Sequence, residues 1–262
     1  MIREIFEKEA NLIDFVQKNK YQNIYLYIDV LTYGVNAEAI RTFVSETKSE
    51  IQGIIYEYYD SLQLMSIGDI SESFVVDISE MIIKNRIRRI TGPEELVSVV
   101  YERLLPLYKI TRGYIMRYSG EIGVIADDVT FANADDFAEI AQLICQDSHL
   151  GKGYVFENIY RQLLDRYNND KCENMIIRKD GIIVSHVATY AVLPEMVVVS
   201  GMLTAPQYRN QGYGKRLLSS FSSYLAQAGK QPVLYCYEED YHTWYEKLGY
   251  QDIGSSAKLD LI

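Results

Sequence analysis

Cysteine, histidine and proline are scarce in this chain of 262 residues, which has 3 Cys, 3 His and 5 Pro. The cysteines and histidines stand far apart and form no C-x-x-C pair, so the sequence indicates neither a zinc site nor a disulfide framework. With so little proline, 48% hydrophobic and 24% charged residues, the composition excludes the disordered and collagen-like classes. The scattered residues are Cys145, Cys172, Cys236, His149, His186 and His242.

Positive charge is also in short supply, since 26 Lys and Arg face 36 Asp and Glu for a net charge of −10. A field of this sign repels DNA, RNA and anionic membranes, so no nucleic-acid partner is expected. No stretch approaches the roughly 18 apolar residues of a membrane helix. The N-terminus carries mixed charge where a signal peptide would have a basic end and an apolar run. We therefore expect a soluble, cytoplasmic protein without metal or membrane partner.

Hydrophobic periodicity predicts alternating helices and strands through the first half of the chain. The apolar spacing predicts a helix between Ile2 and Val16 and a strand over Ile24–Ile28. A hairpin is expected from Ile51–Tyr59 and Leu62–Ile67, followed by a helix over Phe74–Ile82 and a strand over Arg88–Thr91. A helix that starts with proline is expected over Pro93–Leu105, and an extended run over Tyr108–Tyr118.

The second half repeats this order of elements. Two helices follow Asn133, a hairpin turns at Lys179-Asp-Gly181, and Met196–Thr204 reads as a strand. The remaining elements are expected to be a helix over Gly212–Ala228, a strand over Pro232–Tyr237, a helix over Asp240–Leu248 and a last strand. The repetition at a domain-sized offset predicts a structural duplication. We place the boundary near Tyr118, which gives domains over 1–118 and 119–262.

The segment with a chemical signature is Arg209-Asn-Gln-Gly-Tyr-Gly214, between a strand that ends in a proline turn and an amphipathic helix. A helix N-terminus offers unpaired N–H groups and a positive dipole end, and glycines at 212 and 214 let a phosphate approach the backbone. Arg209, Lys215 and Arg216 add positive charge within a few residues. The segment therefore predicts an anion cradle in an otherwise acidic chain.

The same segment resembles the GNAT superfamily of acyl-CoA-dependent N-acyltransferases, whose pyrophosphate loop has the form Gln/Arg-x-x-Gly-x-Gly/Ala. Arg209, Gly212 and Gly214 match it, and Trp244-Tyr-Glu-Lys-Leu-Gly-Tyr250 looks like the family's Tyr-Glu-Lys-x-Gly-Phe signature. The resemblance covers roughly residues 128–254. It implies an α/β fold of the α+β type with two tandem GNAT-like domains, each a mixed twisted sheet flanked by helices.

The resemblance also implies an acetyl-CoA site. The backbone of Met202, Leu203 and Thr204 would pair with the pantetheine arm, and Ser200-Gly201 fits the family's bulge, where backbone N–H groups could polarise the thioester carbonyl. Tyr245 matches the family's general acid, which protonates the leaving thiolate. The residues that would hold the pyrophosphate are Arg209, Asn210, Gln211, Gly212, Tyr213, Gly214 and Lys215.

A general base for the incoming amine is not assigned. Where relatives often carry glutamate this chain has Val198 and Val233, and a glutamate replaces the asparagine usual before the last helix. The remaining candidates are Glu195, Glu238, Glu239 and Asp240, each also readable as a solvated acid.

Other polar residues receive a structural interpretation. Cys236 is expected to pack rather than act as a nucleophile, and His186 and His242 are expected to be surface or strand residues. Lys84, Arg86, Arg88 and Arg89 are read as solvated charges at the ends of a helix and a strand.

The first half lacks the cofactor signature. Its corresponding junction, Ile67-Gly-Asp-Ile-Ser-Glu-Ser73, has one glycine, two acids and no basic residue, and would repel a pyrophosphate. We therefore interpret the first half as a degenerate GNAT-like domain.

These observations favour an N-acetyltransferase that transfers an acetyl group from acetyl-CoA to a primary amine of a small molecule or peptide by direct attack. The alternatives are a non-catalytic acyl-CoA-binding regulator and a protein-interaction module. A homodimer stays open.

Overall fold

A computed structural model of the protein describes residues 2–48, 50–148, 154–168 and 172–262. The chain divides into two compact units, one formed by residues 1–116, 235–242 and 252–262 and the other by 117–234 and 243–251. The order of helices and strands in residues 2–118 recurs in residues 129–261, which bears out the predicted duplication. None of the described helices is long and apolar enough to cross a membrane.

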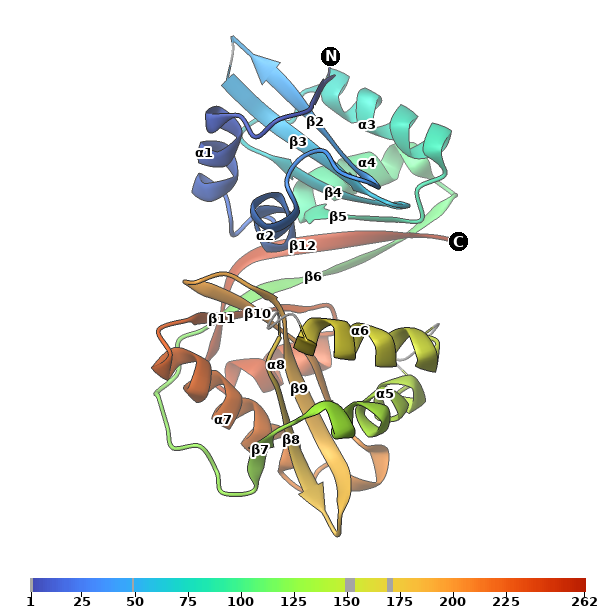
Figure 1. The fold of residues 1–262 in the computed structure, drawn as a ribbon. Coiled ribbons are helices and arrows are strands. Elements are labelled where there is room, and N and C mark those ends of the chain that lie inside the picture. The colour runs from blue at the N-terminus through green and yellow to red at the C-terminus, as the bar shows by residue number, and fades with distance from the viewer. Residues whose placement is uncertain (1, 49, 149–153, 169–171) are drawn as a thin grey trace. The chain divides into compact units, whose positions relative to one another are not determined.

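The first unit is a mixed sheet in the order β1-β2-β3-β4-β5-β12-β6. Helices α1 and α2 cover one face, and the apolar stripes of α3 and α4 pack on the other, against residues such as Ile55, Leu64 and Ile90 (Figure 1). The elements are β1 (Ile2–Ile5), α1 (Ala10–Lys18), α2 (Ile24–Tyr33), β2 (Ile40–Thr47), β3 (Glu50–Tyr58), β4 (Ser61–Ser66), α3 (Glu72–Asn85), β5 (Arg89–Pro93), α4 (Glu94–Leu104) and β6 (Tyr108–Tyr118).

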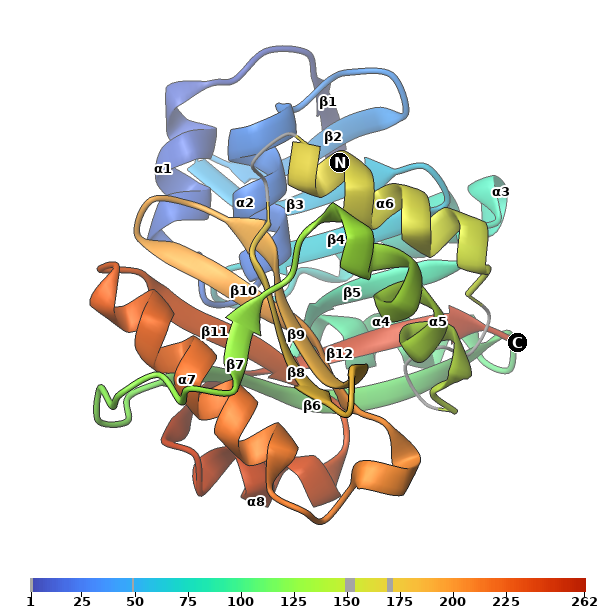
Figure 2. The same ribbon diagram turned by 60° about the horizontal axis from the view of Figure 1, so that its bottom comes forward.

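The second unit contains strands in the order β11-β10-β9-β8-β7. In Figure 2 strands β7 to β10 lie between α7 on one side and α5 and α6 on the other. The remaining elements of the chain are β7 (Val129–Phe131), α5 (Phe137–Gln146), α6 (Phe156–Asn168), β8 (Asn174–Lys179), β9 (Ile182–Val192), β10 (Met196–Thr204), α7 (Tyr213–Gln227), β11 (Gln231–Cys236), α8 (Glu239–Glu246) and β12 (Tyr250–Leu261).

The last strand of the chain belongs largely to the first unit. In β12, residues 256–260 pair with Arg89–Pro93 of β5 in antiparallel register, and β12 lies between β5 and β6. A division into two consecutive segments at Tyr118 does not anticipate this return of the chain. The boundary at 118/119 itself stays a prediction.

Two predictions for the first unit are wrong. Residues Ile2–Ile5, expected to open a helix that runs to Val16, form strand β1 paired with β2, and the helix begins only at Ala10. The sequence predicted a strand at Ile24–Ile28, whereas these residues open helix α2. The Asn23 side chain caps the helix by accepting the Leu26 N–H at 3.1 Å. Because the helix is buried on several sides, its apolar run lacks the polar positions that mark an amphipathic helix.

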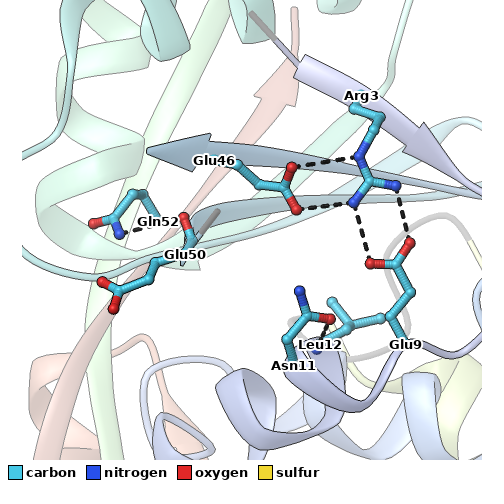
Figure 3. Close-up of polar contacts among 7 residues, drawn as sticks. All are labelled: Arg3, Glu9, Asn11, Leu12, Glu46, Glu50 and Gln52. Atoms are coloured by element: carbon cyan, nitrogen blue, oxygen red, sulfur yellow. Dashed lines mark hydrogen bonds and ion pairs between the residues drawn. The ribbon is translucent and has the colours of Figure 1, made fainter. Parts of the chain in front are cut away.

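A charge network ties the N-terminal strand to its neighbours. The Arg3 guanidinium on β1 pairs with Glu9, just before α1, at 2.9 Å and with Glu46 of β2 at 2.8 Å, as Figure 3 shows. Both carboxylates stabilise the charged form of Arg3, whose pKa is raised. The network therefore fixes the edge strand β1 and the start of α1 to β2.

Candidate active site

Strand β10 carries an irregularity at the predicted place. Its antiparallel register with β9 jumps from Ser200 opposite Ala188 to Leu203 opposite His186, so that Gly201 and Met202 face a single residue. Gly201 has φ +62°, a left-handed conformation that favours glycine. The Ser200-Gly201 signal in the sequence therefore marks a β-bulge.

Strands β10 and β11 pair only at their beginnings in the described register. The parallel ladder joins residues 196–198 of β10 to 231–233 of β11 and ends at Val198 and Val233. Both valines are fully buried, so the ladder ends inside the core. Beyond this point an elongated ligand can pair with the edge of β10, as a peptide adds to a sheet.

Helix α7 begins with an exposed, uncapped N-terminus. Gly212 occupies the N-cap position with φ +84°, and no side chain caps the first turn, which carries no acidic residue. A Cβ built on Gly212 would meet no atom within 4 Å. The first-turn N–H groups and open space give the predicted anion cradle the geometry it needs.

Two of the three cations near this cradle are paired with aspartates. The Arg209 guanidinium donates to Asp147 at 2.6 Å and to the Thr204 carbonyl at 3.1 Å, and Arg216 pairs with Asp128 at 2.6 Å. Arg209 thus fastens the loop to the end of β10. Asp147 and Asp128 were missed because they lie 62 and 88 residues away in sequence.

The third cation, Lys215, lines a cavity of about 310 Å³. Ser219 and Ser223 continue this wall along the helix, and Lys247 lines it after α8. Two ammonium groups and two hydroxyls suit a phosphate group. Sequence reasoning did not assign Lys247, although it lies two residues after Tyr245 within the second motif.

The two sequence motifs meet in space. A Cβ built on Gly214 would lie 3.0 Å from Thr204 Oγ1 and 3.7 Å from the Trp244 ring. The end of β10, the start of α7 and the helix α8 therefore converge on this glycine. A side chain at position 214 would push these elements apart, which explains the second glycine of the motif.

Tyr245 follows Trp244 and is held by an aromatic cluster. Its ring packs edge-on against Trp244 at 5.1 Å and against Tyr250 at 5.8 Å. Tyr250 is buried and its hydroxyl bonds Ser222 of α7 at 2.8 Å, and burial raises the pKa of Tyr250. Tyr245 is only partly buried.

His186 is buried on strand β9, which agrees with the expectation of a surface or strand residue, whereas His242 is buried on helix α8, so the expectation is wrong for His242. His186 Nδ1 lies 3.0 Å from the Gly201 carbonyl oxygen, and Nε2 lies 2.9 Å from the Asn174 side-chain amide. Burial lowers the pKa of His186 to about 4. His242 Nε2 lies 2.9 Å from Asp252.

The candidate bases and Cys236 are placed as follows. Glu195 is exposed and directly precedes β10, on the side of the strand away from the bulge. Glu239 accepts a hydrogen bond from Tyr114 at 3.1 Å, and the Glu238 carbonyl accepts the first-turn N–H groups of α8. Cys236 is buried and its pKa is raised by burial, which disfavours the thiolate. No contact in the described part of the chain selects one carboxylate as the base.

The remaining polar groups agree with their structural interpretation. Arg88 and Arg89 pair with Asp60 and Asp260 and are largely exposed. Within the described ranges, no three His, Cys, Asp or Glu side chains come together as a metal site. His149 lies outside the described residues.

The corresponding helix start in the first unit is built differently. Ser71 caps α3 by accepting the Phe74 N–H at 3.3 Å, and Glu72 stands in the first turn. The Phe74 ring packs directly on Gly53 of β3. A capped and acidic helix start does not attract a phosphate.

Comparison with known proteins agrees with this geometry. Residues 170–252 match the family model described as "Acetyltransferase (GNAT) domain". This segment of the chain is similar to a GNAT acetyltransferase domain. The matched segment includes β10, the cradle at the start of α7, and Tyr245. No curated protein sequence matches the chain.

Solved structures share the fold of the whole chain. A GNAT-family acetyltransferase from Colwellia psychrerythraea aligns with TM-score 0.62 and 11% identity over 100% of both chains. A tandem GNAT protein from the clavulanic acid biosynthesis pathway aligns with TM-score 0.61 and 8% identity over 99% of this chain and 98% of that one. A GCN5-related N-acetyltransferase from Kribbella flavida aligns with TM-score 0.60 and 15% identity over 96% of this chain and 95% of that one. The predicted α/β fold with tandem GNAT-like domains is confirmed.

Proposed function

We propose that the protein is an N-acetyltransferase that transfers the acetyl group of acetyl-CoA directly to a primary amine of a small molecule or peptide. The observation that carries the proposal is the meeting of the uncapped N-terminus of α7, the bulged end of β10 and Trp244 of α8 around Gly214, with Tyr245 next to Trp244 in the chain and packed on its ring. These are a phosphate-binding element, an edge for an extended ligand, and a proton donor.

The residues present fit acetyl-CoA. The N–H groups from Asn210 to Lys215 would hold the pyrophosphate, because the left-handed Asn210 and Gly212 turn this backbone without a side-chain cap. Lys215 and Lys247 would meet a further phosphate of the cofactor in their cavity. Met202, Leu203 and Thr204 would pair with the pantetheine arm. Acetyl-CoA supplies an acyl group activated as a thioester.

The chain's own groups would then assist the transfer. A C–N bond would form, the C–S bond would break and the amine nitrogen would release a proton to solvent, so negative charge would develop first on the carbonyl oxygen and then on sulfur. The Met202 N–H at the bulge would stabilise the first charge, and Tyr245 would donate a proton to the sulfur. A buried Cys236 with a raised pKa favours direct attack over an acyl-enzyme.

Cofactor binding is tested first, by the thermal midpoint of the full chain with and without saturating acetyl-CoA. A ligand at a hundred times its Kd adds about 2.7 kcal/mol, or a few degrees. We expect this shift in the wild type and not in Gly212→Glu, whose carboxylate would occupy the cradle.

Gly181→Glu is the matched control. Gly181 has φ +82° and an equally open surrounding, but it lies in the β8–β9 turn. Both variants should lose similar stability from the strained backbone, and only Gly212→Glu should lose the ligand shift. Equal shifts in all three proteins would place the cofactor elsewhere.

Turnover is then measured as release of the CoA thiol with a panel of amines that includes polyamines, amino acids and peptide N-termini. Thiol release that depends on both acetyl-CoA and an amine supports the transferase. Binding of acetyl-CoA without turnover of any amine between pH 6 and 10 would favour a non-catalytic acyl-CoA-binding protein, a reading that agrees with Val198 and Val233 at the positions where relatives often carry glutamate.

A further inference from the structure

His186 has no role in the function proposed above, yet it contacts the bulge directly. Its side chain is buried on β9, 1% exposed, and both ring nitrogens have polar partners. One partner is the carbonyl of Gly201 in β10, and the other is the side-chain amide of Asn174 in β8. The ring therefore links three neighbouring strands at the level of the bulge.

The chemistry of these partners fixes the position of the ring proton. The Gly201 carbonyl can only accept, so Nδ1 carries the hydrogen and donates it over 3.0 Å. Burial lowers the pKa of the ring to about 4, so the imidazole is neutral near pH 7. Nε2 is then an acceptor. The structure places Asn174 Oδ1 2.9 Å from Nε2 and lets the amide nitrogen donate to Cys172 Sγ at 3.3 Å, so this tautomer requires the Asn174 amide to be turned, with its NH₂ donating to Nε2.

This hydrogen bond replaces a missing contact of the sheet. Gly201 and Met202 stand outside the ladder between β10 and β9, so the peptide between them has no partner strand to orient it. The carbonyl and N–H of a trans peptide point in opposite directions. With its carbonyl held by His186, this peptide directs the Met202 N–H away from β9.

The fit between ring and bulge is close. A Cβ built on Gly201 would lie 3.3 Å from His186 Cε1, and the φ of +62° disfavours any side chain. The bulge and the imidazole are thus matched in shape as well as in hydrogen bonding.

We propose that His186 is a positioning residue, whose Nδ1–H holds the Gly201 carbonyl so that the Met202 N–H faces and polarises the carbonyl of the bound thioester. The inference rests on the proposed acetyl-CoA site, and it adds a buried neutral histidine as the group that aims the backbone donor.

The test observes the thioester carbonyl itself and needs no acceptor amine. The infrared band of ¹³C-carbonyl acetyl-CoA is recorded bound to the full chain and to three variants. His186→Asn keeps an amide N–H near the position of Nδ1, His186→Gln places its amide near Nε2, and His186→Leu removes the donor. We expect the wild-type band in His186→Asn and a band at higher frequency, from a less polarised carbonyl, in the other two.

A kinetic split is expected from the same variants with any amine that the enzyme accepts. Loss of an aimed oxyanion donor lowers kcat by about 100-fold. The KM for acetyl-CoA should stay within about threefold, because the phosphate-binding loop is untouched.

Thr189→Val separates this role from general stability. Thr189 is buried on the same strand, and its hydroxyl accepts the Glu173 N–H at 2.8 Å. This variant should lower the thermal midpoint and leave the carbonyl band unchanged. If the His186 variants do not fold, Gly201→Ala moves the bulge away from the ring and should raise the band frequency.

The two proposals fail in different ways. Variants that bind acetyl-CoA with the wild-type band in His186→Leu, or in Gly201→Ala, overturn the role of His186 and leave the acetyltransferase intact. A wild-type chain that does not bind acetyl-CoA overturns the proposed function, and this inference with it.

Discussion

At the scale of single residues, the proposed mechanism depends on Tyr245 of α8. Tyr245 is partly buried between Trp244 and Tyr250, and the proposed mechanism asks it to protonate sulfur. Tyr245→Phe removes the proton and keeps the ring packing. We expect kcat for CoA release to fall about 100-fold, which is the lower end of the range for general acids, with little change in the acetyl-CoA Kd.

Tyr241→Phe is the control on the same helix. Tyr241 is 46% exposed, and loss of its hydroxyl should leave kcat unchanged. Equal losses of kcat in both variants would mean that removal of either tyrosine hydroxyl disturbs α8. An unchanged kcat in Tyr245→Phe would show that Tyr245 does not act as the general acid.

His186 also makes stability depend on pH. Its pKa is about 4 in the folded chain and 6.5 as its ordinary value, because burial penalises the imidazolium. Between pH 6.5 and 4 the imidazole of His186 is therefore protonated in the unfolded chain and neutral in the folded chain. The stability this group provides is complete above pH 6.5 and is lost as the pH falls toward 4. Between pH 7.5 and 5 the loss amounts to about 2 kcal/mol.

Urea denaturation at the two pH values measures this loss. His186→Asn cannot take up the proton, so the difference in its unfolding free energy between pH 7.5 and 5 should be smaller than that of the wild type by about 2 kcal/mol. The same pH dependence in both proteins would show that His186 is not held neutral.

The sequence predicts the backbone part of the site better than its side-chain pairs. Gly212, Gly214 and the Ser200-Gly201 bulge are local signals, since a turn or a bulge depends on neighbouring residues. The pairing of Arg209 with Asp147, and of His186 with Asn174 and Gly201, depends on which strands become neighbours. No spacing rule contains that information.

Among the elements, both predicted hairpins form, because each joins two apolar runs across a short polar turn. No element was predicted for strand β2, and a strand was predicted where α2 begins. The N-terminal contacts of α2 explain this error. Its Ile24 N–H is satisfied by the hydroxyl of Tyr235, 211 residues away, so tertiary contacts rather than local pattern stabilise the helix.

The attachment of β1 gives a testable effect on one element. Arg3 joins β1, β2 and the start of α1, but it is 46% exposed, so solvent screens its ion pairs. Arg3→Gln should lower the unfolding free energy by about 1 kcal/mol or less at low salt. The difference in thermal midpoint from the wild type should shrink in 0.5 M NaCl.

Arg88→Gln is the matched exposed control. The Arg88 side chain is 77% exposed and lies 3.6 Å from Asp60, so its loss should leave the thermal midpoint unchanged. If Arg3→Gln destabilises the chain equally at low and high salt, the cause is the lost packing of the aliphatic part of the Arg3 side chain and not its lost charge.

Across the whole chain, the same order of elements has produced two different helix starts. In the second unit α7 begins at a left-handed glycine with no cap and no acid, whereas in the first unit α3 begins at Ser71, whose side chain occupies the Phe74 N–H, with Glu72 beside it. Asp69 precedes this cap. A pyrophosphate would find N–H donors at the start of α7 and electrostatic repulsion at the start of α3.

This asymmetry predicts one acetyl-CoA per chain. Isothermal titration of the full chain should give a stoichiometry of one, and Gly212→Glu should abolish all of the heat while Gly181→Glu retains it. Two equivalents in the wild type, one of them retained in Gly212→Glu, would mean that the duplication has kept two cofactor sites and that electrostatics at the helix start does not separate the two units. A single equivalent that survives in Gly212→Glu would mean that the one cofactor site does not lie at the start of α7.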